Sequence, residues 1–585
     1  MNPISIETAV GYLNAGLSCL PAERAKKHPS IGSWKTWATR LPTQIEVEAW
    51  FANAQDGICV VAGAVSGNLE CMDFDNHGEL FEAWMQKVDK RSANRKCAGD
   101  AVPLAYYDAL GIETAIRSHM RGRKVEFDVN ALLRLLVSER LLAPGSKHAA
   151  LERAGRHFCR CDLSESDVYR GLDELSRMAP AIVSRMNASI AHAGIRDLAC
   201  GYYDCKNYYF EIDDEDELRR RGVSKENRRL PIVQMGLLQD GHGIPVDFHL
   251  FPGNAHDSDT LLEALPEAKR AAGMQRVVVV ADKGMNCSAN IIATVAKGDG
   301  FVFSQSIRGT KSSAKLRDWA ISDEGYREDG GGEFKIKSKQ DFKTITIGKD
   351  ISADGKAHRE DVDVKIVAFW SRKHAERARH EREKLLQKAE QLVNCPGRYT
   401  KATHFGAAKY VKNIDFDEES GEVVTCAKAP RIDWEAVGAD AACDGYYCII
   451  TSETDWSDER ILDAYRGLWK IEESFKVTKS WLKARPVFVW NHDRIRAHFL
   501  TCYVALVLER LIEHALGHRY SAQAILEDMR ALECSELESN IWLFDHRSDL
   551  TDELFALIGE EPPRKYMRRT DIKALFKKGK EIRWA

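Results

Sequence analysis

The stretch RLPIVQMGLLQDGHGIPVDFHLFPG, residues 229–253, predicts two antiparallel β-strands joined by a tight turn. Two mainly apolar runs flank Asp240 and Gly241, a pair that favours hairpin turns because both residue types tolerate the backbone angles that such turns need. The run ACGYYDCKNYYFEI, residues 199–212, comes before them and is rich in tyrosine, which is typical of strands. The centre of the chain is therefore predicted to hold three consecutive strands.

A helix and a fourth strand follow these three strands. DSDTLLEALPEAKRAAG, residues 257–273, has helical character, and RVVVVADKG, residues 276–284, contains a strand apolar enough to be buried on both faces of a sheet. Three antiparallel strands, a helix and a fourth strand are the opening order of a ribonuclease-H-like fold. A further core strand, DGYYCIITSE at residues 444–453, and the closing helices at residues 457–482 come only after a long intervening stretch, which we interpret as an insertion domain.

The predicted fold class is α/β: a ribonuclease-H-like catalytic core with a strand-containing insertion domain, a helical N-terminal segment and a small α+β N-terminal fragment. The predicted segments are the α+β fragment at 1–90, a linker at 91–102, the helical segment at 103–198, the first part of the core at 199–309, the insertion domain at 310–445, the second part of the core at 446–520 and a helical, basic C-terminal segment at 521–585. The segment at 103–198 fits either a small DNA-binding domain or a plain packing bundle.

Composition limits the classes of function. The 585 residues carry a formal net charge of -4, so contact with nucleic acid must come from local basic clusters such as RRRGVSKENRR at 219–229 and PPRKYMRRTDIKALFKKGK at 562–580. The 15 cysteines form no CxxC pair, which favours free thiols over disulfides or a zinc site. Because no signal peptide or membrane-spanning run is apparent, we expect a cytoplasmic protein with no membrane partner.

Two aspartates stand where strands are otherwise apolar or aromatic. Asp204 interrupts a Tyr-rich strand, where aspartate is disfavoured, and Asp282 closes the buried run VVVVAD. Either one alone fits equally well as a turn or capping residue. Together with Glu472 on a helix packed beside them, they would place three carboxylates around two divalent cations about 4 Å apart. Oxygen ligands favour Mg²⁺ or Mn²⁺ over softer metals.

The segment YRGLWKIEESFKVTK, residues 465–479, spaces Tyr465, Glu472 and Lys479 seven residues apart. Seven residues are close to two helical turns, so a continuous helix would put all three on one face. Glu472 would then hold a cation while Tyr465 and Lys479 contact phosphate oxygens. Glu473 would point about 100° away from that face. The alternative is an ordinary surface helix, because Glu and Lys are common solvated residues.

Four of these motifs in order are similar to one known family. YYDCKNYYFE, the run from SKENRR to SDTL, VVADKG and YRGLWKIEESFKVTK together resemble the DDE transposases of bacterial insertion sequences, in the subgroup whose glutamate helix bears a Tyr-Arg-Glu-Lys signature. The likeness runs from about residue 103 to the C-terminus. It implies DNA strand cleavage and strand transfer, with Asp204, Asp282 and Glu472 as the catalytic and metal-binding triad and two Mg²⁺ or Mn²⁺ ions as cofactors.

The resemblance also implies DNA contacts and an assembly. Tyr465 and Lys479 would contact phosphates of the transposon ends, and Arg466 and Lys476 are further candidates for DNA binding on the same segment. The implied partners are transposon ends and target DNA, bound by a homodimer. The sequence departs from the signature at one position, because the arginine expected three residues after Tyr465 is Leu468. Arg466 is near but is expected to project from another part of the helix.

The first 90 residues resemble a different family. AVGYLNAGLSCLP, KHPSIGSWKTW and GICVVAGAVSGNLECMDFDN look like the start of the primase-polymerase domain of phage and plasmid replication proteins. Asp73 and Asp75 alternate by two on one predicted strand, so both carboxylates face the same side and could share metal ions. The later acid and histidine motifs of that domain should lie beyond residue 90, where helices of the transposase type begin. We therefore interpret this part as truncated, with Asp73 and Asp75 as vestigial acids.

Three functions are compatible with these patterns. The first is a DDE transposase that cuts and joins DNA. The second is a catalytically inactive DNA-binding chimera, a relic in which fusion to the N-terminal fragment removed the usual start of the transposase. The third is a replication protein of primase-polymerase type that uses Asp73 and Asp75.

Overall fold

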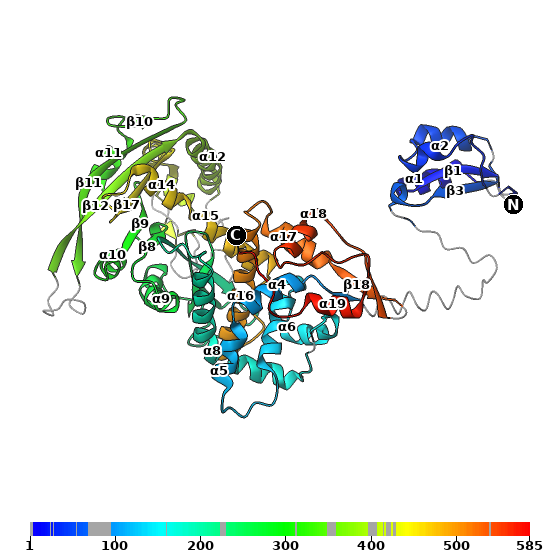
Figure 1. Cartoon of the computed structure of the whole chain (residues 1–585). Helices are drawn as coiled ribbons and strands as arrows, with labels where there is room; N and C mark the ends of the chain where they lie inside the picture. The colour runs from blue at the N-terminus through cyan, green and yellow to red at the C-terminus, as the bar shows by residue number, and fades with distance from the viewer. Residues whose placement is uncertain are drawn as a thin grey trace. The chain divides into compact units, whose positions relative to one another are not determined.

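The protein was analysed as a computed structural model, and it forms two compact units, Met1–Ala93 and Asn94–Ala585 (Figure 1). The structure describes residues 4–23, 25–26, 28–53, 55–67, 69, 95–159, 161–222, 230–309, 313–347, 358–395, 406–413, 415–416, 423–424, 429–537 and 540–584.

The smaller unit combines two helices with a three-stranded sheet. Helices α1 (Ile6–Asn14) and α2 (Gln44–Phe51) pack on strands in the order β2 (His28–Pro29), β1 (Ser18–Glu23) and β3 (Gly57–Val61). Ala9, Cys19, Val47 and Phe51 form its core, as the predicted α+β character requires. Short 3-10 turns lie at Lys35–Ala38 and Ala64–Ser66. Asp73 and Asp75, which we predicted to share a strand, lie outside the described residues.

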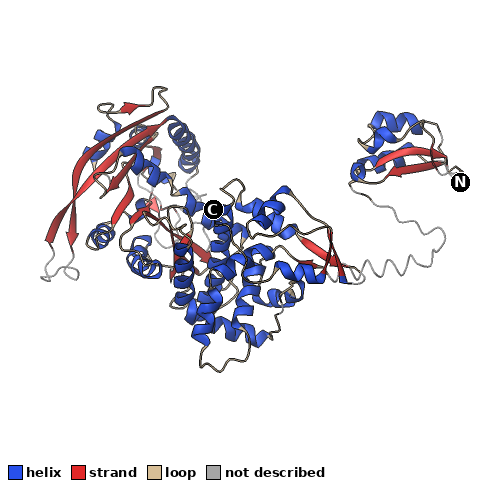
Figure 2. Ribbon diagram, viewed as in Figure 1, coloured by secondary structure: helices blue, strands red, loops and turns tan. Residues whose placement is uncertain are grey.

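The larger unit is organised around one nine-stranded sheet (Figure 2). Its order is β10 (Arg327–Glu328), β11 (Phe334–Ile347), β12 (His358–Ser371), β17 (Tyr446–Thr451), β9 (Gly300–Gln305), β8 (Val278–Ala281), β5 (Cys200–Tyr209), β6 (Ile232–Gln239) and β7 (Pro245–Pro252). Strands β5, β6 and β7 are antiparallel, and β8 and β9 run parallel to β5. This is a ribonuclease-H-like core, and the four strands expected at 199–284 are all present.

The insertion continues the core sheet. Its long hairpin of β11 and β12 joins the sheet through β17, which pairs antiparallel with β9. The edge of β9 is thereby paired, which removes an open row of backbone donors and acceptors. The remaining elements in this stretch are α11 (Ala314–Ile321), α12 (Arg372–Asn394), η6 (Ala408–Tyr410), β13 (Val411–Lys412), β14 (Asp415–Phe416), β15 (Val423–Val424), β16 (Arg431–Ile432) and α13 (Trp434–Ala441).

Helices cover both faces of the core strands. Alternate residues of β5 belong to different cores and show which helices pack on each face. Tyr203 and Cys205 belong to a core shared with α9 (Asp257–Ala272) and α10 (Ser288–Val295). Tyr202 and Tyr208 belong to the opposite core, shared with α14 (Asp458–Arg466), α15 (Trp469–Lys476) and α16 (His492–Ala515). Because side chains alternate along a strand, Asp204 lies on the same face as α15.

The predicted helical segment packs on α16 (Figure 1). It contains α4 (Ala101–Ala109), α5 (Ile112–Met120), α6 (Val129–Leu142), α7 (Lys147–Glu152), the 3-10 turn η3 (Ala154–Arg156) and α8 (Glu165–His192). Most of α16 is buried, including the charged residues Glu509, Arg510 and Glu513. Within the described ranges, no helix has both the length and the apolar character needed to cross a bilayer.

Two predictions about the ends of this unit need correction. The linker predicted at 91–102 already contains β4 (Lys96–Cys97) and the start of α4, because β4 pairs with β18 (Glu533–Glu536). The C-terminal segment, predicted to be helical, contains three strands besides its helices. In addition to β18 these are β19 (Ile541–Phe544) and β20 (Tyr566–Arg568), and the helices are α17 (Ala522–Ala531), α18 (Asp549–Ala556) and α19 (Arg569–Leu575). Strands this short carry little alternation, so the sequence pattern missed them.

Candidate functional site

The parallel pairing of β5 and β8 aligns the two predicted aspartates. Cys200, Gly201 and Tyr202 pair with Val278, Val279 and Val280. Two residues further along each strand stand Asp204 and Asp282, so the same register brings them opposite each other on strands about 5 Å apart. Asp282 follows the end of β8 and caps the 3-10 turn η4 (Lys283–Met285), and its Oδ1 accepts the Lys283 backbone N–H at 2.7 Å.

Glu472 is positioned by contacts on both sides of it along the helix. The Lys470 ammonium donates to the Gly241 carbonyl at 2.5 Å, and the Gln239 amide donates to the Ser474 hydroxyl at 2.5 Å. At Gly467 the chain passes so close to Tyr202 that an added Cβ would lie 2.0 Å from its phenol oxygen. These contacts fix α15 against β5 and β6, where Glu472 faces the aspartates.

All three predicted carboxylates line one cavity of about 640 Å³. The other residues that line it are Tyr203, Lys206, Asp257, Gly284, Met285, Phe334, Phe369, Ser371, Lys373, His374, Tyr447, Tyr465, Arg466, Leu468 and Ile471. The cavity therefore collects side chains from the core strands, the insertion strands and the glutamate helix. Residues far apart in the sequence meet there.

A lysine lines the cavity and forms an ion pair with one of the carboxylates. Lys206 stands two residues after Asp204 on the same face of β5, and its Nζ lies 2.5 Å from Asp204 Oδ2. Burial opposes the charge of this ammonium, but Asp204, Glu472 and Asp257 outweigh it and raise the pKa of Lys206. Asp204 is thus paired with an internal cation.

Tyr465 lines the same cavity as the three carboxylates. Burial is the largest influence on its phenol and raises its pKa, and the carboxylates of Asp282 and Glu472 raise it further, whereas a hydrogen bond with Ser304 lowers it. Tyr465 is therefore a neutral hydrogen-bonding group beside two of the three acids at neutral pH.

Arg466 and Leu468 also line the cavity. Arg466 is the last residue of α14, and its guanidinium lies 5.4 Å from the centre of the Phe334 ring, which also lines the cavity. Leu468 occupies the position where the signature arginine was expected, and its aliphatic side chain brings no charge.

The expected single helix face does not extend to Lys479. The helix is interrupted at Gly467 and Leu468, between α14 and α15, and the turn η7 (Val477–Trp481) is a π-helix. A π-turn has more residues per turn than an α-helix, so residues within it, Lys479 included, no longer fall on the α-helical stripe. Lys479 lies 5.4 Å above the Tyr208 ring and does not line the cavity.

Two charged neighbours on α15 point elsewhere. Lys476 pairs with Glu473 at 3.2 Å on the exposed side of the helix, and neither lines the cavity. This matches the prediction that Glu473 points away from the Glu472 face.

The sequence interpretation missed further residues of the site. Asp257, at the start of α9, adds a fourth carboxylate to the cavity, and Lys206 adds the internal cation. His374 at the start of α12 contacts the Tyr447 ring at 5.0 Å, and burial lowers the pKa of its imidazole, so it is neutral at pH 7. Two sequence signals could have indicated these residues. Asp257 lies in the acidic first turn of a predicted helix, and Lys206 follows Asp204 by two residues, which places both on the same face of a strand.

The donor set is suited to a hard divalent cation. Carboxylate oxygens are the ligands that Mg²⁺ and Mn²⁺ prefer, and all three predicted ligands open onto the same cavity. With Lys206 paired to Asp204, however, no group of three or more His, Cys, Asp or Glu side chains in the described ranges is arranged to hold a metal ion.

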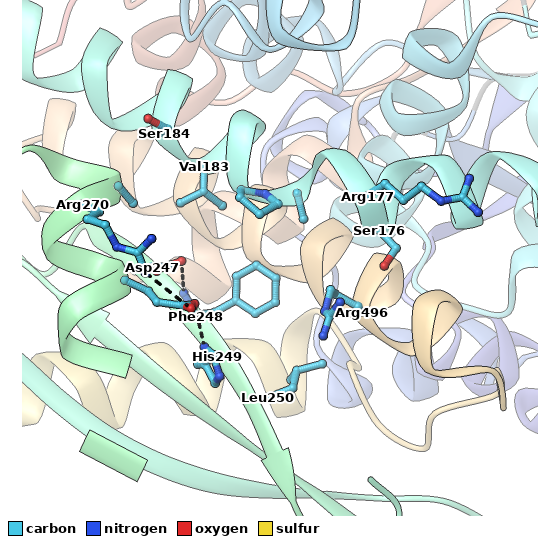
Figure 3. A pocket seen from close by; sticks show the side chains of 14 residues that line it. Ser176, Arg177, Val183, Ser184, Asp247, Phe248, His249, Leu250, Arg270 and Arg496 are labelled. Atoms are coloured by element: carbon cyan, nitrogen blue, oxygen red, sulfur yellow. Dashed lines mark hydrogen bonds and ion pairs between the residues drawn. The ribbon is translucent and has the colours of Figure 1, made fainter. Parts of the chain in front are cut away.

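A second cavity, of about 580 Å³, lies at the far edge of the sheet and holds none of the predicted site residues (Figure 3). Asp247 and Phe248 of β7 line it together with Val183 of α8 and Arg270 of α9. Burial is the main cause that raises the pKa of Asp247 to about 7.

Comparison with known proteins identifies the larger unit. A family model described as Transposase DDE domain matches residues 211–508, just over half of the 585-residue chain. The chain belongs to the DDE transposase family. The match includes Asp282 and Glu472 and begins seven residues after Asp204. A second model, for the N-terminal domain of bifunctional DNA primase/polymerases, matches residues 9–153.

Other comparisons are sparser. No curated protein matches the chain. Among solved structures, a piggyBac transposase synaptic complex with hairpin DNA aligns at a TM-score of 0.34 and 7% identity, covering 81% of this chain and 84% of that chain.

The family match confirms the predicted transposase resemblance and gives the chain a transposase function in general terms, in a family that uses divalent metal ions. The primase-polymerase resemblance at the N-terminus is also confirmed. The second match runs past residue 93 into α4 to α7, which belong to the larger unit.

Proposed function

We propose that this DDE transposase cleaves DNA strands at the ends of an insertion sequence and transfers the freed 3'-ends to target DNA, with Asp204, Asp282 and Glu472 as the catalytic and metal-binding carboxylates. The observation that carries the proposal is their convergence on one cavity from two adjacent strands and a helix. Asp257 lines the same cavity and adds negative charge.

Each group in the cavity has a distinct task in this proposal. The three carboxylates would hold two Mg²⁺ or Mn²⁺ ions, which when bound supply an activated nucleophile and stabilise the leaving oxygen. Tyr465 would donate a hydrogen bond to a phosphate oxygen, and Arg466 and Lys373, which also line the cavity, would offset the charge of the DNA backbone. Asp204 would bind a cation in place of the Lys206 ammonium with which it is now paired.

Tyr465 and Arg466 are therefore proposed as the DNA-contacting residues nearest the reacting phosphate. Lys476 and Lys479, which lie outside the cavity, would contact the backbone further along the strand. Transposon ends and target DNA are the proposed partners, bound by a homodimer.

A matched pair of variants on one helix turn tests the assignment. Glu472→Gln should reduce Mg²⁺-dependent nicking of DNA that carries the inverted repeats flanking the coding region by about 10³-fold or more, because a transition-state contact is lost. Glu473→Gln changes the adjacent carboxylate outside the cavity and should retain activity. Asp282→Asn should behave like Glu472→Gln. Equal nicking by the Glu472→Gln and Glu473→Gln proteins would show that the carboxylate assignment is incorrect.

The primase-polymerase match defines a second candidate function, DNA-templated primer synthesis by the N-terminal part. Residues 95–153 of the matched range pack in the core of the transposase unit, which favours a truncated domain without this activity. Primer synthesis on a single-stranded template that is lost in Asp73→Asn would instead support the second candidate.

A further inference from the structure

Residues 482–490, here called the aromatic loop, connect the π-turn after the glutamate helix to α16 and expose two large aromatic side chains. Phe488 is 56% exposed and Trp490 is 63% exposed. Two valines alternate with these rings along the chain, and both are buried: Val487 is 2% exposed and Val489 is 6% exposed. The loop is therefore anchored through one set of side chains and presents the other set outward.

Side chains from α6, α16 and α17 form hydrogen bonds with the backbone at the start of the loop. The Arg140 guanidinium donates to the Leu482 and Lys483 carbonyls at 3.1 Å each, from a side chain that is almost fully buried. Arg530 donates to the Trp481 carbonyl at 3.0 Å, and the buried His498 ring nitrogen Nε2 donates to the Ala484 carbonyl at 2.9 Å. Four consecutive carbonyls thus have cationic or imidazole donors.

This bracing holds a strained backbone. Lys483 has a φ of 45°, in the left-handed region that residues with a side chain rarely adopt. The His498 ring that supports the next residue is itself fixed by the buried Lys147, whose Nζ lies 2.8 Å from Nδ1. A strained and rigidly supported loop with two exposed aromatic rings is costly to build for packing alone.

The aromatic loop lies at the end of the strand that carries Asp204. The Val487 backbone N–H donates to the Tyr209 carbonyl at 3.2 Å, and the hydroxyls of Tyr208 and Thr478 are 2.8 Å apart. Tyr209 is five residues beyond Asp204, which is about 17 Å along a strand, or about five nucleotides of one DNA strand. A DNA strand that runs from the carboxylates along β5 would therefore reach this loop.

The charge of the segment suits a nucleic acid. Residues 477–490 contain Lys479, Lys483 and Arg485 and no acidic residue. Exposed aromatic rings beside basic side chains are the arrangement that binds unpaired nucleotides, because bases stack on the rings while the cations follow the phosphates.

We infer that the aromatic loop is a stacking site for unpaired DNA bases, with Trp490 and Phe488 as the stacking rings and Lys483 and Arg485 beside the phosphates. The inference rests on the proposed function, since it assumes that DNA occupies the neighbouring cavity. The site would hold bases that leave the DNA duplex near the cleaved end. Stacking on the aromatic side chains would then replace the stacking that these bases lose in the duplex.

Binding measured without cleavage tests the inference. All proteins carry Asp282→Asn, and the probes are a fluorescein-labelled 20-nucleotide oligothymidine and a duplex of the same length, followed by fluorescence anisotropy. Trp490→Ala should weaken oligothymidine binding about 10-fold to 100-fold, while duplex binding changes by less than about threefold. Trp490→Phe, which keeps a ring, should restore most of the affinity. Trp434→Ala, at a tryptophan of 65% exposure in α13, is the matched control and should bind as the parent does.

Three outcomes would overturn the inference: unchanged oligothymidine binding by a Phe488→Ala and Trp490→Ala double variant, an equal loss of single-stranded and duplex binding, or a changed oligomeric state by sedimentation with unchanged DNA binding. The last result would mean that the rings contact protein. Circular dichroism and thermal unfolding check that the variants fold. Failure here with loss of nicking in Glu472→Gln would refute only the stacking site, whereas normal nicking by Glu472→Gln would refute the proposed function.

Discussion

A buried histidine between two carboxylates gives a prediction whose size follows from the structure. His157 is 6% exposed, its Nδ1 lies 2.8 Å from Asp100 and its Nε2 lies 2.9 Å from Glu139. Burial is the largest single influence and disfavours the imidazolium, but the hydrogen bonds to Asp100 and Glu139 outweigh it and raise the pKa of His157 to about 9. The charged ring thus joins the N-terminus of α4 to α6 and to the end of η3.

The direction of the pH dependence follows from this raised pKa. A histidine that binds its proton more tightly in the folded state stabilises the fold fully below its unfolded pKa of about 6.5 and loses that contribution as the pH rises through about 9. The shift corresponds to about 3 kcal/mol, of which about 2 kcal/mol is lost between pH 7 and pH 9. His157→Gln should lower the free energy of unfolding at pH 7 by about 3 kcal/mol or more, because two buried carboxylates lose their cation.

The assay is urea unfolding of the full chain at pH 7, 8 and 9, with the parent and the variant compared at each pH. The parent and the variant are compared because the buried Lys147, whose pKa burial lowers to about 7, makes the stability of both proteins rise with pH over the same range. Subtracting one unfolding free energy from the other removes this contribution. The difference in unfolding free energy should shrink by about 2 kcal/mol from pH 7 to pH 9. His148→Gln, at an exposed histidine nearby, should show no such slope. A constant difference for His157→Gln would refute the role of the imidazolium.

Three further variants test the cavities and the helix that carries the glutamate. Lys206→Met should increase the affinity for Mg²⁺ about tenfold by titration calorimetry, because no ammonium then competes for Asp204, and weaker binding would contradict that view. Gly467→Ala should lower nicking at least about tenfold and destabilise the fold by about 1 to 3 kcal/mol, since the new Cβ would meet the Tyr202 phenol, and unchanged activity would argue against the close approach. Asp247→Asn should raise the free energy of unfolding above pH 7 and leave it unchanged near pH 4. The reason is that the pKa of Asp247 is raised to about 7 in the folded protein, so the parent loses stability as the pH rises through that value. Parallel pH profiles of unfolding free energy for the parent and the variant would refute this role of Asp247.

Much of the core could be predicted from local pattern. The Tyr-rich run around Asp204, the hairpin at Asp240 and the buried run before Asp282 each specify a strand through residue type and alternation, and β5, β6, β7 and β8 occupy those ranges. The short strands β4, β18 and β20 could not be predicted, because two to four residues form a strand only when distant partners supply the hydrogen bonds.

The candidate site also has features that the sequence predicts and features that only the tertiary structure sets. The sequence by itself determined that carboxylates end or interrupt apolar strands, because burying an acid is unfavourable unless something nearby uses it. Only the tertiary structure decided which acids meet: the parallel register of β5 and β8 aligns Asp204 with Asp282, and close packing at Gly467 brings Glu472 to them. It also paired Lys206 with Asp204 and placed Lys479 in the π-turn, outside the cavity. Periodicity is a property of neighbours along the chain, whereas a site depends on how separate segments pack, and that is fixed only when the whole fold has formed.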